Sequence, residues 1–140
     1  MTLEAIERKR AARKADLQAA ADVQRAIDVE ALDGCEICHG DTSVCHVDVS
    51  YTPGLPTMAV ARVPKPAELK RYRARIKHRD GQVDVVAANE AAEELAASCL
   101  VYPDKEIFAA MCEARPGLKA QLGSRASQLA AGKAAEEEKD

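Results

Sequence analysis

Proline and glycine residues divide the second half of this chain into short segments, and they constrain its fold more than any other feature. Proline interrupts a helix because it lacks a backbone N–H and clashes with the preceding turn, and glycine commonly ends one. Such residues stand at positions 63–66, 80–81, 102–104, 115–117 and 132. The intervals between these joints are short. Residues 64–132 are therefore predicted to form a bundle of about four short helices.

Each of these intervals carries apolar residues at helical spacing. Pro66 suits the first position of the first helix, Asp104 can cap the third, and Gly123 should weaken the middle of the fourth. The apolar core candidates are Leu69, Tyr72, Ile76, Val85, Val86, Ala92, Leu95, Cys99, Leu100, Ile107, Phe108, Met111, Cys112, Leu118, Leu122 and Leu129. We expect these stripes to face a common core.

The N-terminal part, residues 1–33, is predicted to be one long helix running from residue 2 to about residue 30. Thr2 can cap it, and Glu4 and Glu7 stand near the positive end of the helix dipole. One rough face consists of Leu3, Ile6, Arg10, Arg13, Leu17, Ala20, Gln24 and Ile27. Because two arginines interrupt this face, the helix is expected to dock on the rest of the protein only in part.

Residues 34–63 predict a small antiparallel sheet of two or three strands. Apolar and polar residues alternate over residues 44–51, which is the period of two expected in a strand. Residues 57–62 alternate in the same way, with Met58 and Val60 on one face. A bare hairpin is marginal in water, so a helix should cover one face of this sheet.

The predicted fold class is therefore α+β, mainly α: a long N-terminal helix, the small sheet, and then the helical bundle. Residues 133–140 are expected to be an acidic, disordered tail. Apolar residues make up 47% of the chain, but many are alanine, and aromatic residues make up only 3%. Alanine buries little area, so the core should be thin, and a partner or self-association is expected to complete it.

The charge is unevenly distributed along the chain. The formal net charge of -3 argues against nucleic acid as a partner. One basic run covers residues 8–14, and a second forms a basic face on the first helix of the bundle: Lys70, Arg71, Arg73, Arg75 and Lys77. We expect this face to be solvated; the alternative is a docking face for an acidic partner or for the chain's own acidic tail.

The sequence also predicts a compartment. The segment after Met1 is charged almost at once, unlike a secretory signal. No apolar run approaches the roughly 20 residues that a membrane-spanning helix needs. A cytoplasmic protein with reduced thiols and no membrane partner is therefore predicted.

The segment C-E-I-C-H at residues 35–39 has three interpretations. Its letters match a c-type haem attachment site, but that chemistry needs export to an oxidising compartment. Cys35 and Cys38 could bind zinc together with Cys45 and His46. However, neighbouring side chains on a strand point to opposite faces, which opposes a site using both Cys45 and His46. The favoured interpretation is that the cysteines are small strand and core residues, with no cofactor; zinc is the alternative.

No catalytic constellation is apparent. The serines lie in no G-x-S-x-G motif, and the chain has neither a phosphate-binding loop nor a dinucleotide-binding glycine pattern. Neighbouring carboxylates such as Glu93 and Glu94 fit a solvated helix face. A non-enzymatic protein is therefore predicted.

Several segments resemble the helical part of bacteriophage tail assembly chaperones. They are V-A-R-V-P-K-P-A-E-L-K-R-Y at residues 60–72, E-L-A-A-S-C-L-V-Y-P-D at 94–104 and E-A-R-P-G-L at 113–118. The closing L-A-A-G at 129–132, before the acidic tail, is also similar. The resemblance covers residues 60–132, about half of the chain.

This resemblance implies a protein of the bacterial host cytoplasm that keeps the tape measure protein soluble and helps tail tube subunits assemble around it. Amphipathic helices around a thin core can hold another helix in a groove. The apolar residues expected to contact the partner are Leu95, Leu100, Ile107, Phe108 and Met111, each of which could instead be core. The alternatives are a small zinc-binding adaptor or regulatory protein and a structural component of the tail or head.

Overall fold

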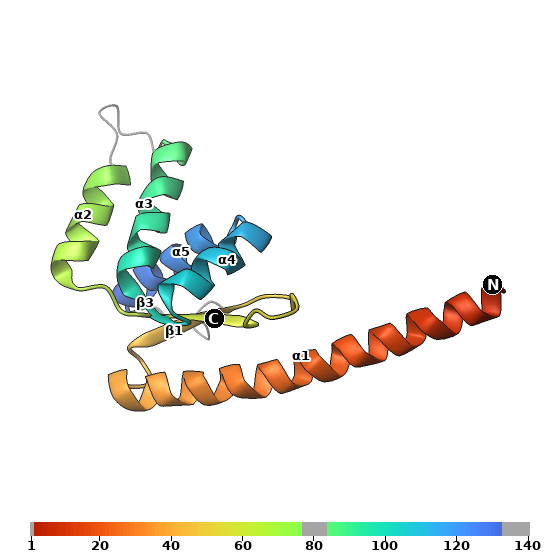
Figure 1. Cartoon of the computed structure of the whole chain (residues 1–140). Coiled ribbons are helices and arrows are strands. Elements are labelled where there is room, and N and C mark those ends of the chain that lie inside the picture. The colour runs from red at the N-terminus through yellow and green to blue at the C-terminus, as the bar shows by residue number, and fades with distance from the viewer. Residues whose placement is uncertain (1, 77–83, 133–140) are drawn as a thin grey trace, which may run out of the picture.

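The computed structural model describes residues 2–76 and 84–132. The elements in chain order are α1 (Leu3–His39), β1 (Val44–Asp48), β2 (Met58–Arg62), α2 (Pro66–Ile76), α3 (Val85–Cys99), β3 (Leu100–Tyr102), α4 (Lys105–Ala114) and α5 (Leu118–Ala130). The predicted class, a mainly helical α+β fold, is confirmed (Figure 1). Lys77, the joint at residues 80–81 and the acidic tail at 133–140 lie outside the described residues.

The elements form three layers (Figure 1). The three strands make an antiparallel sheet in the order β1-β2-β3. The long helix α1 crosses one face of this sheet, and α3, α4 and α5 cover the other, with α2 packed beside α3 (Figure 1). The expectation that a helix covers the sheet is therefore met on both faces.

The predicted alternation in the strands is also confirmed. β1 and β2 pair in register from Val44 opposite Arg62 to Asp48 opposite Met58. Val44, Met58 and Val60 belong to a small cluster that also touches Leu32 of α1. The intervening side chains enter a larger cluster with the helices on the opposite face: Val47, Ala59, Ala61, Leu95, Ala96, Cys99, Phe108, Met111, Leu118, Leu122 and Ala126. The alternation thus matches the two faces of the sheet, although Val44, which belongs to the mostly polar set of β1, is also buried.

The helix starts follow the sequence. The Thr2 side chain accepts a hydrogen bond from the backbone N–H of Ala5, and Asp104 accepts one from Ile107. Both predicted caps are therefore present. Asp84 caps α3 in the same way, with bonds from the next turn of that helix.

Two boundaries differ from the sequence prediction. α1 continues to His39, well past residue 30, so the C-E-I-C-H segment is the end of a helix and the prediction of strand residues there was wrong. The helix continues because Leu32 and Cys35 pack against the sheet, and such tertiary contacts override weak local preference. Leu100, expected to end the second bundle helix, instead begins β3 and pairs with Ala61.

Gly123 allows α3 and α5 to cross very closely. A Cβ atom placed on this buried glycine would lie 1.8 Å from the backbone oxygen of Ala92 in α3. No side chain fits there, so the low helix propensity of glycine is offset by close packing of two backbones. This contact fixes the helical layer that covers the sheet.

Candidate interaction surfaces

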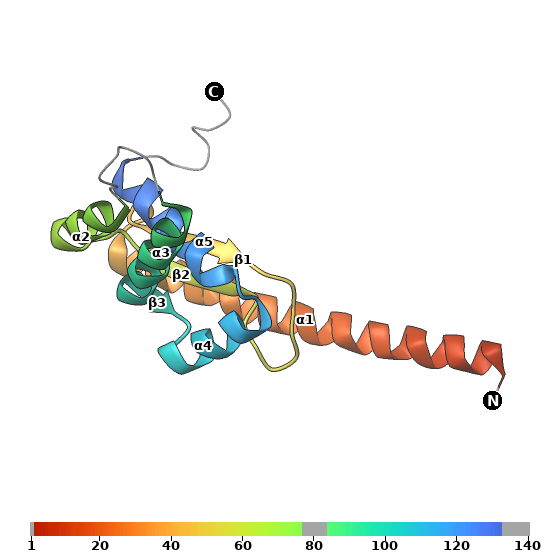
Figure 2. The ribbon, with the colours of Figure 1, turned by 90° about the horizontal axis from the view of Figure 1, so that it is seen from above.

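The first half of α1 projects beyond the rest of the protein as an arm (Figures 1 and 2). Every side chain from residue 7 to residue 20 is exposed. The helix begins to bury side chains only near Asp28, where it crosses the sheet. We call residues 3–20 the α1 arm. The prediction that this helix docks only in part agrees with this arrangement.

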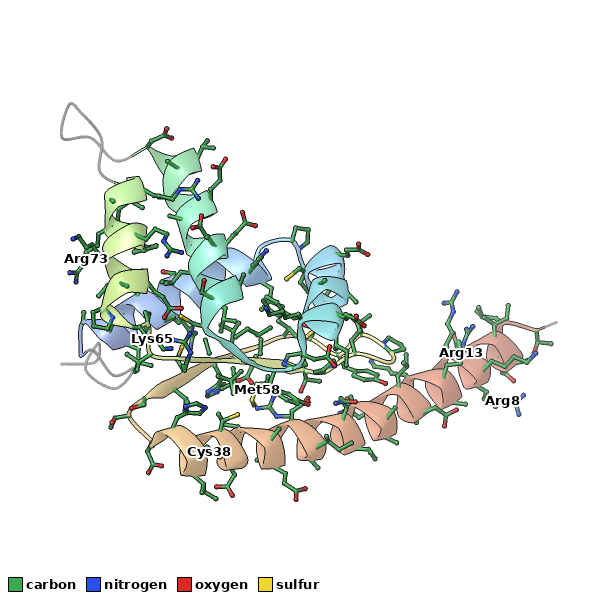
Figure 3. All side chains as sticks on the ribbon, turned by 60° about the vertical axis from the view of Figure 1, so that its left-hand side comes forward. Arg8, Arg13, Cys38, Met58, Lys65 and Arg73 are labelled. Carbon is green, nitrogen blue, oxygen red and sulfur yellow. The ribbon has the colours of Figure 1, made fainter. Side chains whose placement is uncertain are left out.

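The α1 arm carries an apolar stripe that is interrupted by cations. Leu3 and Leu17 are 69% and 49% exposed, and both lie on the face predicted from the sequence. Arg10 and Arg13 stand between them, and Arg8 and Arg13 mark the arm in Figure 3. An isolated helix of this kind is marginal in water, because most helical stability in proteins comes from packing of the apolar face. Leu3 and Leu17 thus remain exposed in the described structure.

Asp28 anchors the root of the arm to the sheet. Its side chain is fully buried and accepts hydrogen bonds from the Thr57 backbone N–H (2.7 Å), the Thr57 hydroxyl (2.6 Å), Gln24 (3.0 Å) and Tyr102 (2.6 Å). A buried carboxylate requires such partners because desolvation strongly disfavours an unpaired charge. Burial, together with the bond to Asp28, raises the pKa of Tyr102. Asp28 was not predicted as a site residue, because nothing in the sequence shows which side chains of this helix meet the sheet.

The basic face of α2 is only partly available. Lys70, Arg71 and Arg73 are exposed. Arg75 instead pairs with Glu94 and Glu90 of α3, the latter at 3.1 Å, so its charge is committed to holding α2 on α3. The remaining predicted member, Lys77, lies outside the described residues.

A second ion pair ties α2 to the sheet. Arg62 of β2 donates two hydrogen bonds to Glu68 of α2, at 2.8 and 2.9 Å, and a third to the backbone oxygen of Ser98 at 2.9 Å. The bonds from Arg62 lower the pKa of Glu68 to about 2. This fork-to-fork geometry is the strong form of an ion pair. It joins the sheet, α2 and the end of α3.

The residues predicted to contact a partner mostly lie inside this protein. Leu95, Phe108 and Met111 are buried in the larger core cluster, and Leu100 packs against that cluster from a half-buried position. Ile107 alone of the five is exposed, at 39%. The structure thus brings four of them together in or against the core instead of on one exposed surface.

The zinc alternative does not fit the arrangement of its ligands. Cys35 packs against the α1 side of the sheet, whereas Cys45 packs against the opposite side. Within residues 2–76 and 84–132, no three His, Cys, Asp or Glu side chains form a group able to hold a metal ion. Burial also raises the pKa of the Cys45 thiol to about 11, which disfavours the thiolate that zinc needs. The four residues Cys35, Cys38, Cys45 and His46 are therefore not brought together as one site in the described structure.

Comparison with known proteins gave no match to a family model, a curated protein or a solved structure. In the described part of the chain, no helix is both long and apolar enough to cross a membrane. The α1 arm is the candidate interaction surface, because residues 7–20 are exposed and Leu3 and Leu17 share one face of it. Sequence periodicity marked the stripe itself, but only the tertiary structure shows that it projects.

Proposed function

We propose that this chain is a non-enzymatic tail assembly chaperone, acting in the bacterial cytoplasm to hold the tape measure protein and assist assembly of the tail tube. The observation that carries the proposal is the α1 arm, an exposed helix on which Leu3 and Leu17 share one face and have no partner among the described residues. The sequence resemblance over residues 60–132 supports the same reading. A binding protein of this kind needs positioned helices and no catalytic groups.

The arm replaces the bundle groove as the surface we assign to the partner. Leu95, Phe108 and Met111 already fill the core, so they are committed to the protein's own stability. Leu3 and Leu17 are exposed and lie on one face of a helix held in place at Asp28. A partner helix laid along this face would bury both side chains and complete an otherwise thin apolar surface.

The proposal is tested by producing the chain together with the tape measure protein encoded in the same genome. We expect the wild-type chain to raise the soluble fraction of that protein, and Leu3→Glu with Leu17→Glu to remove most of the gain. Ile37→Glu is the matched control, because Ile37 is 77% exposed on the same helix but outside the arm. The assignment of the arm would be contradicted if Ile37→Glu lowered the soluble fraction of the tape measure protein, or if the arm variant left that fraction unchanged.

A structural component of the tail is separated from a chaperone by the composition of the finished particle. A chaperone acts during assembly, so the chain should be absent from purified particles. Stoichiometric amounts of it in particles would instead favour the structural role.

For the arm variants and for Ile37→Glu, circular dichroism shows whether the helix content is preserved.

A further inference from the structure

A shallow hollow lies where the start of α2 meets the end of α5. Its apolar lining residues are Val63, Pro64, Pro66, Leu69 and, from α5, Ala130. Lys70 and Arg73 also line it. The hollow therefore combines apolar side chains with two cations, a combination suited to an extended acidic segment.

The two cations are not used elsewhere in the described structure. Lys70 and Arg73 are exposed, and neither forms an ion pair with any residue in 2–76 or 84–132. Arg73 points outward from α2, on the side away from α3 (Figure 3). Arg75, by contrast, is paired with α3. The outer side of α2 thus presents positive charge with no partner among these residues.

The chain itself leaves α5 at this hollow. Ala130 is both the last residue of α5 and part of the lining. Gly132 follows with a φ of 79°, the left-handed conformation that turns a chain away from the helix axis. The sequence continues through residues 133–140 and contains Glu136, Glu137, Glu138 and Asp140. The six residues from 133 to 138 could span about 20 Å if fully extended. The eleven-residue helix α2 is about 16 Å long, so this reach is enough to bring the acidic residues to any part of α2.

We propose that the acidic segment at residues 136–140 docks on Lys70 and Arg73 across this hollow, within the same molecule. A short covalent connection gives the segment a high effective concentration at the hollow, so weak ion pairs are sufficient for docking. The contact covers Lys70 and Arg73 of the basic face of α2. It is independent of the surface on the α1 arm that we assign to the tape measure protein.

The test is carbodiimide cross-linking of the full chain, which joins a carboxylate to a lysine amine with no spacer. Peptide mass spectrometry should find Lys70 joined to Glu136, Glu137 or Glu138. The yield should fall severalfold between about 20 mM and 500 mM salt, because the Debye length shrinks from about 20 Å to about 4 Å. Lys105 of α4 is the matched exposed lysine and should give little of this product.

Variants and isotopes separate docking from chance contact. Arg73→Glu leaves the Lys70 amine in place and should lower the yield about threefold, the effect of losing a surface ion pair, while Arg73→Lys should preserve it. Mixing unlabelled and ¹⁵N-labelled chains shows whether the joined peptides come from one molecule. Equal yield at Lys105, an Arg73→Glu variant that cross-links like the wild type, or mixed-isotope products indicating a second copy would each overturn the proposal.

Discussion

The carboxylate of Asp28 in α1 accepts a 2.6 Å hydrogen bond from the hydroxyl of Tyr102 in β3, although the two residues are 74 positions apart. The bond crosses from the long helix to the far edge of the sheet. With the two bonds from Thr57, it fixes where α1 lies and therefore how the arm projects. The position of the α1 arm, the surface that we assign to the tape measure protein, thus depends on the buried hydrogen bonds of Asp28.

Asp28→Ala is expected to destabilise the protein by about 3 kcal/mol, because it leaves buried donors of Thr57 and Tyr102 without an acceptor. Tyr102→Phe should cost about 1–2 kcal/mol, since it removes one of the donors to the buried side chain of Asp28. Urea unfolding monitored by circular dichroism measures both. Asp22→Ala is the control: Asp22 lies on the same helix but is exposed, and its loss should change stability little. Equal effects at positions 22 and 28 would contradict this account.

Gly123→Ala and Gly34→Ala should have opposite effects. At position 123 the new Cβ would meet the backbone oxygen of Ala92 at 1.8 Å, so the helices must separate. We expect a net loss of about 2 kcal/mol or more, despite the better helix propensity of alanine. At position 34, in α1, no atom lies within 4 Å of the new Cβ, and a gain of up to about 1 kcal/mol is expected. Chemical unfolding midpoints decide between these signs, and stabilisation by Gly123→Ala would refute the close crossing.

Phe108→Asp and Ile107→Asp test whether the predicted partner residues are core or surface. Phe108 is 4% exposed, so a buried charge there should prevent folding. Its neighbour Ile107 is 39% exposed and should tolerate the same change with little loss of helix content. Circular dichroism and soluble yield are the measurements. A well-folded Phe108→Asp variant would instead support the original expectation that Phe108 and its predicted neighbours contact the partner.

Acid should weaken the fold partly through Glu68. Its pKa is lowered from 4.5 to about 2 by the bonds from Arg62, so between these values the unfolded state binds more protons than the folded state. The stabilisation is therefore fully present above about pH 4.5 and is lost as the pH falls toward 2. Urea midpoints of the wild type should decline more steeply over this range than those of Glu68→Gln. Glu106→Gln, at an exposed position, should follow the wild type.

The thiols should react with iodoacetamide at very different rates. Cys38 is exposed, whereas Cys99 is buried and burial raises its pKa to about 11, as it does for Cys45. The thiolate is the reactive form, so at pH 8 Cys38 should be labelled first and Cys45 and Cys99 last. Time-resolved peptide mass spectrometry gives the order. Early labelling of Cys99 would show that the core opens readily.

Much of the fold followed from local pattern. The period of two gave both faces of β1 and β2, and the prolines and caps gave the order and starts of the bundle helices. The end of α1 and the strand β3 did not follow, because each forms through contacts distant in sequence: Cys35 against the sheet, and Leu100 opposite Ala61. The partner residues were chosen by apolar character, which cannot separate core from surface in an amphipathic helix.

The sequence by itself therefore determined most of the element types, the alternation of the strands β1 and β2, the caps and the face of the arm that carries Leu3 and Leu17, because these depend on spacing and on the chemistry of near neighbours. Only the tertiary structure decided that Asp28 is buried, that Gly123 is a crossing point, and that α1 extends beyond the body. Those properties depend on contacts with residues that are distant in the sequence. The spacing of residues within one helix does not show which distant residues it will meet.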